Sequence, residues 1–362
     1  MTLRLNDTQP LNGGETPNIV DNSAAARGDS VEPRPAVNWI AVLKRYRAPS
    51  LKRSWFELFV TIAPLIGLWT GAVWATSISY WLALPICVIA AMFLVRLFLI
   101  QHDCSHGAFF KTRASNDLAG RVIGVFTMTP YDVWKDSHLT HHATHGNLKH
   151  RGVGDVMTLT VDEFEALPFW GRLAYRLYRH PIVLFGLGPM YIFILHHRLP
   201  VGFMTAGWRY WISTMGTNIA LAVLLVAGIY LVGLGPFLMT YLVITLLAAT
   251  IGVWLFYVQH QFEDTIWDTD DEWRLHDAAL YGSSHYVLPP VLQWMTANIG
   301  IHHVHHLYSR IPFYRLHQVL RDHPELGRVQ RLTFIESLKT TRLKLWCARE
   351  RRLVSWKAAG AA

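Results

Sequence analysis

Charged residues and cysteines are both scarce in this chain of 362 residues. Only 16% of the residues are charged, well below the roughly 25% of a soluble domain, whereas 52% are hydrophobic. This balance excludes an ordinary soluble domain and indicates an integral membrane protein. The three cysteines, Cys87, Cys104 and Cys347, are widely scattered, which argues against a disulfide framework and fits a reducing cytosolic face.

Long hydrophobic runs are abundant instead. Four of them are close to the ~20 residues that cross a bilayer, and they cover approximately residues 55–76, 78–100, 210–231 and 236–257. The loop inside each pair of runs has no charge, whereas a basic patch from Lys44 to Arg53 precedes the first run. The positive-inside rule therefore places both chain termini in the cytosol, and we expect a multi-pass protein of the bacterial inner membrane.

The net charge of +8 raises the alternative of nucleic-acid binding. The basic residues, however, flank the apolar runs, so orientation in the membrane accounts for them better. We therefore expect no nucleic-acid partner.

The remaining segments are expected to form a cap on the cytosolic side. Residues 1–36 are polar and predict a disordered tail, while residues 37–355 form one membrane domain followed by a short tail at 356–362. The apolar stretch 181–195 predicts an interfacial helix, and the basic, amphipathic residues 310–357 predict a helical tail on the membrane surface. The predicted fold is all-α, with four transmembrane helices and a cytosolic helical cap.

Three clusters of histidine lie within or beside the apolar sequence. Because residues three or four apart lie on one face of a helix, the histidines of each cluster are expected to point the same way. The eight histidines that share faces in this manner are His102, His106, His138, His141, His142, His302, His305 and His306. His303 is turned about 100° away from its neighbours by the helical period. The charge-based topology, derived without the histidines, places all three clusters on the cytosolic side.

Clustered imidazoles beside membrane spans are costly unless a bound metal compensates. Eight aligned histidines exceed the three or four ligands of one zinc ion, so two ions of higher coordination number fit the count better. Imidazole binds iron, copper, nickel and zinc alike, and the residues by themselves leave the identity of the metal open.

Four further residues lie near the clusters. His260 follows the fourth span and lies on the same cytosolic side as the three clusters, so we predict it as a ninth ligand. Asp103 lies off the ligand face and is expected to orient a ligand imidazole, while Asn298, one turn before His302, is expected to orient a ligand or hold a metal-bound water. His145 continues the second cluster, but Gly146 is expected to end that helix and to remove His145 from the site.

The clusters resemble the histidine boxes of the membrane fatty acid desaturase superfamily, HxxxH, HxxHH and HxxHH. The sequences of the three boxes are most similar to those of the omega-6 (delta-12) acyl-lipid desaturases. They read His-Asp-Cys-Ser-His from His102, His-Leu-Thr-His-His from His138 and His-His-Val-His-His from His302. The resemblance covers about residues 40–355, and the segment from Ser309 to Leu353 shares it.

The resemblance implies four membrane helices, a cytosolic di-iron site and an acyl tunnel. It implies that the eight box histidines and His260 bind two iron ions, and that O2 is consumed while a cis double bond forms in a lipid acyl chain. Stearoyl-CoA desaturases have an Asn one turn before the ligand that corresponds to His260, where this chain has Phe256. The His-Pro-Gly-Gly haem stretch of fused cytochrome domains is absent, so electrons are expected from a separate small redox protein such as a ferredoxin or a cytochrome.

Two alternatives remain open at this stage. A hydroxylase or ketolase acting on a lipid, an alkane or a carotenoid uses the same scaffold and the same boxes. A membrane metal transporter or sensor is the second alternative, but such a protein places ionisable residues within its spans, and the second to fourth spans hold almost none.

Overall fold

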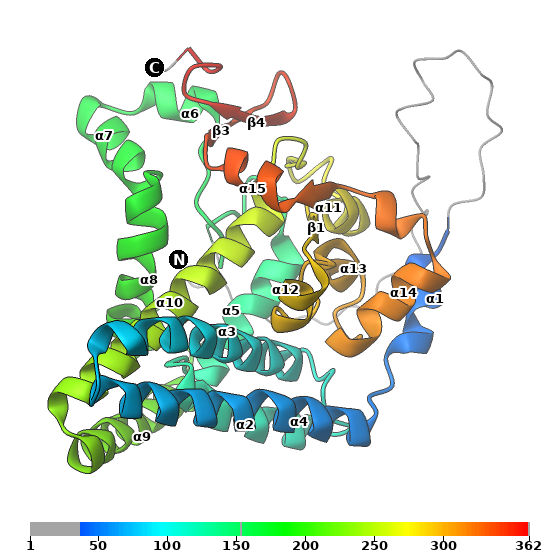
Figure 1. The fold of residues 1–362 in the computed structure, drawn as a ribbon. Helices are drawn as coiled ribbons and strands as arrows, with labels where there is room; N and C mark the ends of the chain where they lie inside the picture. Colours follow the sequence, from blue (N-terminus) through cyan, green and yellow to red (C-terminus); the bar gives the residue numbers. More distant parts are fainter. Residues whose placement is uncertain (1–36, 153, 361–362) are drawn as a thin grey trace.

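The computed structural model describes residues 37–152 and 154–360, so the tail predicted at 1–36 lies outside the described residues. The structure is mostly helical, and four of its helices are long and apolar enough to cross a membrane (Figure 1). The prediction of four candidate spans is confirmed. These helices are α2 Leu51–Thr76, α3 Tyr80–Ser105, α9 Trp208–Val232 and α10 Leu234–His260.

Polar caps and glycine set where the long helices begin and end. The Ser50 side chain accepts a hydrogen bond from the backbone N–H of Arg53 at the start of α2, and Ser79 caps α3 through Trp81 in the same way. Between α9 and α10 the chain reverses at Gly233, whose φ of +86° favours glycine. The apolar span of α3 is 61% buried, the largest share among the four, so α3 is the central helix.

Short helices gather beside the ends of α3 and α10 (Figure 1). They are α4 Arg113–Phe126, α5 Tyr131–Thr144, α11 Leu275–Tyr281, α12 Pro290–Met295 and α13 His302–Leu307. Every residue of α13 is buried. Helix α1 Trp39–Leu43 packs near α14 Leu316–Asp322 through a Trp39–His323 ring contact. Helix α6 Val161–Ala166 precedes α7 Phe169–Tyr178.

The segment predicted as one interfacial helix at 181–195 is irregular. Two π-helical turns, Val183–Leu187 and Tyr191–Leu195, flank the short helix α8 Gly188–Met190. With α7 Phe169–Tyr178 this segment forms a pair bent by 61°, the geometry of a broken span or a re-entrant loop. A π turn leaves carbonyls without their usual helical partner, and the Phe185 carbonyl accepts a hydrogen bond from Thr250 of α10 at 2.9 Å. Placement of this segment at the membrane interface stays a prediction.

The prediction of a helical C-terminal tail is wrong. Strands β3 Leu343–Cys347 and β4 Arg352–Ser355 form an antiparallel hairpin, and β1 His285–Val287 pairs in parallel with β2 Arg331–Thr333. The helices of this region are short: α14, α15 Phe334–Thr340 and two 3-10 turns, Phe313–Arg315 and Leu326–Arg328. The abundant Arg and Lys residues mimic an amphipathic helix, but four apolar side chains are buried in the hairpin, which fits paired strands rather than a surface helix. They are Leu345, Trp346, Leu353 and Val354.

Candidate metal centre

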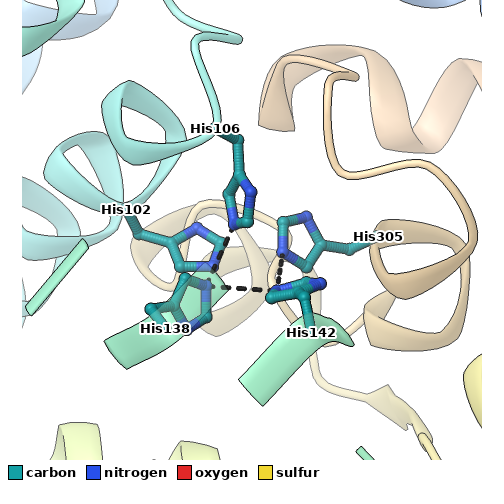
Figure 2. A group of neighbouring side chains, drawn as sticks. All are labelled: His102, His106, His138, His142 and His305. Carbon is teal, nitrogen blue, oxygen red and sulfur yellow. Dashed lines mark hydrogen bonds between the residues drawn. The ribbon is translucent and has the colours of Figure 1, made fainter. Parts of the chain in front are cut away.

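Nine histidines converge at one place from elements far apart in the sequence. Their ring nitrogens form two groups, and within each group the ligand atoms lie within 4.8 Å of one another. The five-histidine group, drawn in Figure 2, consists of His102, His106, His138, His142 and His305. The four-histidine group consists of His141, His260, His302 and His306. The structure thus brings together all nine histidines that the sequence proposes as ligands.

Each of the two HxxHH boxes is divided between the groups. On α5, His138 and His142 belong to the five-histidine group and His141 to the other. On α13 the division is reversed, because His302 and His306 belong to the four-histidine group and His305 to the other. Residues four apart are offset by only about 40° around a helix, whereas residues three apart are offset by about 60° in the opposite direction. The spacing of the box therefore aims its members at two neighbouring points.

The Nε2 atoms point toward one another at nearly constant spacing. The Nε2 atoms of His106 and His138 are 3.0 Å apart, and those of His138 and His142 are 3.1 Å apart. In the four-histidine group, the Nε2 atom of His260 lies 3.2 Å from that of His141 and 3.0 Å from that of His302. Two nitrogens held about 2.1 Å from one metal at a right angle would be about 3.0 Å apart. The spacing fits ligands of higher-coordinate metal ions.

Burial favours the neutral form of several of these imidazoles. It lowers the pKa of His138, His142, His305 and His306 well below the usual value, and neighbouring histidines lower it further. Neutral imidazole is the form that binds a metal, whereas clustered imidazolium ions would repel one another. The side chains present therefore fit two metal ions held mainly by nitrogen.

Asp155 is a site residue that the sequence reasoning missed. One of its carboxylate oxygens lies 3.1 Å from Nδ1 of His141, and its side chain is 6% exposed. It follows Gly154, whose φ of +67° favours glycine and whose added Cβ would lie 3.2 Å from the Cβ of His141. A carboxylate on the distal nitrogen is the usual way to fix the orientation of a ligating histidine. The only sequence signal was a Gly- and Asp-containing loop after the second box.

Asp103 and Asn298 meet at the backbone of Phe313. One carboxylate oxygen of Asp103 accepts a hydrogen bond from the Phe313 N–H at 2.7 Å, and the other lies 3.7 Å from Nδ1 of His102. The Asn298 side-chain amide donates to the Phe313 carbonyl at 3.1 Å. The expectation that Asn298 shares a helix with His302 is wrong, because α13 begins at His302 and Asn298 has a φ of +55°. Action of Asp103 and Asn298 on the metal ligands stays a prediction.

The two histidines placed outside the ligand set have different surroundings. His303 faces away as predicted, with Nε2 2.8 Å from the Leu326 carbonyl and its ring 5.3 Å from that of His285. His145 caps α5 just before Gly146, as predicted, yet its ring lies 4.4 Å from that of His260. Burial lowers the pKa of His145 to about 4, so this imidazole is also neutral.

An apolar cavity of about 730 Å³ opens onto the histidines. His102, His138 and His302 form part of its wall, and the rest is mainly hydrophobic. The residues of α10 in this wall extend from Thr245 to Gln259, about 21 Å of helix at 1.5 Å per residue. The Trp134 ring also lines the cavity and stacks on His138 with centroids 4.8 Å apart.

Comparisons with known proteins identify the family. The sequence profile described as "Fatty acid desaturase" matches residues 79–337, more than half of the chain. A protein of Bacillus subtilis (strain 168) named "Fatty acid desaturase" is 42% identical over 313 residues, which cover 86% of this chain and 88% of that protein. This chain belongs to the fatty acid desaturase family. The family membership confirms the resemblance drawn from the histidine boxes.

More distant desaturases have more specific names. An "sn-1 oleoyl-lipid 12-desaturase" of Anabaena variabilis is 23% identical over 288 residues, which cover 73% of this chain and 74% of that protein. An "sn-1 acyl-lipid omega-3 desaturase (ferredoxin)" of Synechocystis sp. is 26% identical over 300 residues, which cover 78% of each chain. The desaturase described here therefore resembles enzymes named as acyl-lipid desaturases over about three-quarters of its length.

Proposed function

We propose that this desaturase inserts a cis double bond into a membrane-lipid acyl chain, with delta-12 (omega-6) regiochemistry. The observation that supports this proposal most directly is that members of both histidine groups, His102 and His302, form part of the wall of the apolar cavity. Long apolar cavities of 300–1,000 Å³ are typical of sites that enclose a small apolar ligand, and this one has about 730 Å³. The regiochemistry is supported by the wording of the boxes and by a 12-desaturase among the relatives.

Two iron ions are the proposed cofactor. The five-histidine group and the four-histidine group would each hold one ion through neutral imidazoles. When bound, the irons supply the activation of O2 and the removal of two hydrogens from neighbouring methylenes. In the overall reaction, the two hydrogens, two protons and two electrons from an external donor convert one O2 to two waters.

The protein side chains contribute binding, orientation and exclusion of water. Apolar residues of α3 and α10, such as Phe98 and Ala248, would hold the acyl chain without hydrogen-bonding groups that compete for it. The Trp134 ring packs against Phe98 at 5.1 Å and against His138 at 4.8 Å, so it covers part of one member of the five-histidine group. A methylene held near His102 and His302 therefore meets a dry site, and its position along the cavity selects the carbon that reacts.

An external redox protein is the proposed electron source. The net charge of +8 favours an acidic partner, because long-range attraction raises the rate of encounter. The printed name of one relative includes ferredoxin, which makes a ferredoxin the first candidate and a small cytochrome the second. We place the protein in the bacterial inner membrane with both termini in the cytosol, where such carriers are available.

Expression in a bacterial host that makes monounsaturated but no polyunsaturated lipids tests this function. We expect new dienoic acyl chains with the second bond at carbon 12, located by mass spectrometry of derivatised fatty acids. The matched control is His305→Ala, which removes one member of the five-histidine group and should yield none. New monoenoic acyl chains without any dienoic chains would overturn the delta-12 assignment. Hydroxylated lipid or ketocarotenoid would overturn desaturation itself.

A further inference from the structure

A buried arginine outside both histidine groups connects segments that belong to the site. Arg179 follows α7 as its C-cap and is 0% exposed. Its Nη1 donates to the Met157 carbonyl at 3.2 Å and to the Thr158 hydroxyl at 3.1 Å. Its Nη2 donates to the Gln261 side-chain oxygen at 2.8 Å and to the Leu343 carbonyl at 3.1 Å. All four of these acceptors are neutral oxygens.

Three of the acceptors adjoin the four-histidine group along the chain. Two of them lie in the loop two and three residues after Asp155, whose carboxylate is 3.1 Å from Nδ1 of His141. The third, Gln261, comes directly after His260, where α10 ends, and is 2% exposed. The guanidinium of Arg179 therefore holds the Asp155 loop and the end of α10 at a fixed distance from each other.

The chemistry of the guanidinium suits this arrangement. A buried charge whose partners are all neutral is costly unless several hydrogen bonds compensate for it. A guanidinium has five N–H donors in a rigid plane, whereas a lysine ammonium has its three donors on one atom. The planar fork of Arg179 can therefore bind acceptors on three separate segments, which are the Asp155 loop, the end of α10 and β3.

The same face of α7 also binds the backbone of the loop. The Tyr178 hydroxyl accepts a hydrogen bond from the Met157 N–H at 3.0 Å, and the Tyr175 hydroxyl accepts one from the Leu159 N–H at 3.0 Å. These two bonds do not involve Arg179. Replacing Arg179 should therefore loosen the loop without detaching it from α7.

We propose that Arg179 is a positioning residue, which holds His260 and the Asp155–His141 pair in place for the metal ion of the four-histidine group. It acts through Gln261 and through the loop, and it is not itself a ligand. The inference rests on the proposed pair of iron ions, but it requires no particular lipid substrate or double-bond position. A merely structural role would weaken both histidine groups, whereas a positioning role weakens only one.

Arg179→Lys is the informative variant, because it keeps the buried charge and removes the planar fork. The full-length protein, purified in detergent and loaded with Fe(II), is dialysed against a chelator, and the iron per chain is then measured. We expect the wild type to keep about two irons and the variant about one, since a displaced ligand weakens a single site.

Arg198→Lys is the matched control. Arg198 also donates to neutral oxygens, on Asn218 at 2.7 Å and on Met128 at 2.6 Å, but neither of these residues adjoins a histidine of the two groups in the chain. This variant should keep both irons. Loss of one iron in Arg198→Lys as well would overturn the specific role of Arg179.

Combined variants show which histidine group Arg179 supports. His141→Ala removes a member of the four-histidine group, and His305→Ala removes a member of the five-histidine group. Added to His141→Ala, Arg179→Lys should cause no further loss of iron, because the same group is already weakened. Added to His305→Ala, it should remove the remaining iron, because the two changes then weaken different groups.

The outcomes separate this inference from the proposed function. Two irons retained in Arg179→Lys, or an equal further loss in both combined variants, would overturn the role of Arg179 and leave the di-iron proposal intact. A wild-type protein that binds fewer than two irons would instead overturn the di-iron proposal.

Gln261→Met replaces Arg179→Lys if that variant does not purify as a monodisperse protein. It removes only the acceptor next to His260 and leaves the other three bonds of Arg179 in place. The same loss of one iron is expected, and two irons retained in Gln261→Met would overturn the inference.

Discussion

A carboxylate oxygen of Asp155 lies 3.1 Å from Nδ1 of His141, on the side of the ring opposite the histidine cluster. His141 belongs to the four-histidine group, and its Nε2 lies 3.2 Å from that of His260. The carboxylate favours the tautomer in which Nε2 is free to bind a metal. His260 is oriented in a comparable way, since its Nδ1 donates to the Gly282 carbonyl at 3.3 Å.

Replacing Asp155 by Asn should lower iron affinity and activity together. Outer-sphere partners of metal-bound histidines typically contribute about 10- to 100-fold, and we expect a loss in that range. Iron retention during chelator dialysis and fatty-acid profiles of expressing cells are the two measurements. Asp162→Asn, an exposed carboxylate on α6, is the control and should behave like the wild type. Unchanged iron retention in Asp155→Asn would contradict the orienting role.

The division of each HxxHH box between the two groups gives a second prediction. His141→Ala should weaken the four-histidine group and His305→Ala the five-histidine group, and each should reduce desaturation by more than about 100-fold. His303→Ala should be milder, because His303 contacts the Leu326 carbonyl and not the groups. Iron content and product yield check all three variants. Equal losses of iron and product in the three variants would show that the direction in which each histidine of α13 points does not matter for metal binding.

The cavity offers a site at which a side chain can be added cleanly. Gly252 lines the cavity, and an added Cβ would meet no atom within 4 Å. Gly252→Leu should therefore fold normally yet obstruct the acyl chain, and an overpacking cost of about 1–3 kcal/mol corresponds to roughly a 5- to 150-fold loss of binding. The measurement is the conversion of acyl chains of different length, with the longest chains affected most.

Gly216 of α9 provides the control for this variant. It also has open space around its Cβ position, but it does not line the cavity. Gly216→Leu should leave the product profile unchanged. A similar loss in both variants would indicate a general effect of leucine in the spans and would argue against the cavity as the acyl site.

A buried ion pair inside the spans leads to a prediction about stability. Arg96 of α3 pairs with Glu57 of α2, both side chains are 1% exposed, and Arg96 also lies 4.0 Å from the ring of Trp294. Glu57→Leu alone leaves a buried guanidinium with one fewer partner, so we expect a loss of about 3–5 kcal/mol in unfolding free energy. The double variant Arg96→Met with Glu57→Leu should recover part of that loss.

Thermal unfolding in detergent measures these differences. Arg113→Gln is the control, because the Arg113 side chain is 79% exposed and its partner oxygen on Asp117 is 3.8 Å away. Its unfolding temperature should match the wild type. A double variant less stable than Glu57→Leu alone would contradict the idea that the unpaired charge causes the loss.

Iron should also act as a stabilising ligand. Because the histidine groups come together only in the folded chain, metal binding favours the folded state by mass action. We expect the unfolding temperature of metal-stripped protein to rise steadily as Fe(II) is added, and the rise should be smaller in His141→Ala. A temperature independent of Fe(II) would contradict binding at the clustered histidines.

The sequence was most informative where the signal is local. The length and composition of the spans and the three- and four-residue spacing of the boxes are properties of single helices, so nine converging histidines could be predicted from them. The C-terminal region shows the limit of this reasoning. Residues 343–355 are rich in Arg and Lys like a surface helix, yet they form a hairpin, because burial of Trp346 and Leu353 against other segments outweighs local propensity.

The sequence by itself determined that this chain has four spans long enough to cross a membrane and that its histidine clusters lie at the same ends of those spans. Both properties depend on the length of apolar runs and on the helical period, which can be counted along the chain. Only the tertiary structure decided how the histidines divide into two groups, which carboxylate adjoins His141 and which residues line the apolar cavity beside them. Those features depend on contacts between residues far apart in the chain, such as His141 with His260 and Asp103 with Phe313. No local pattern encodes such contacts, since they follow from how whole helices pack.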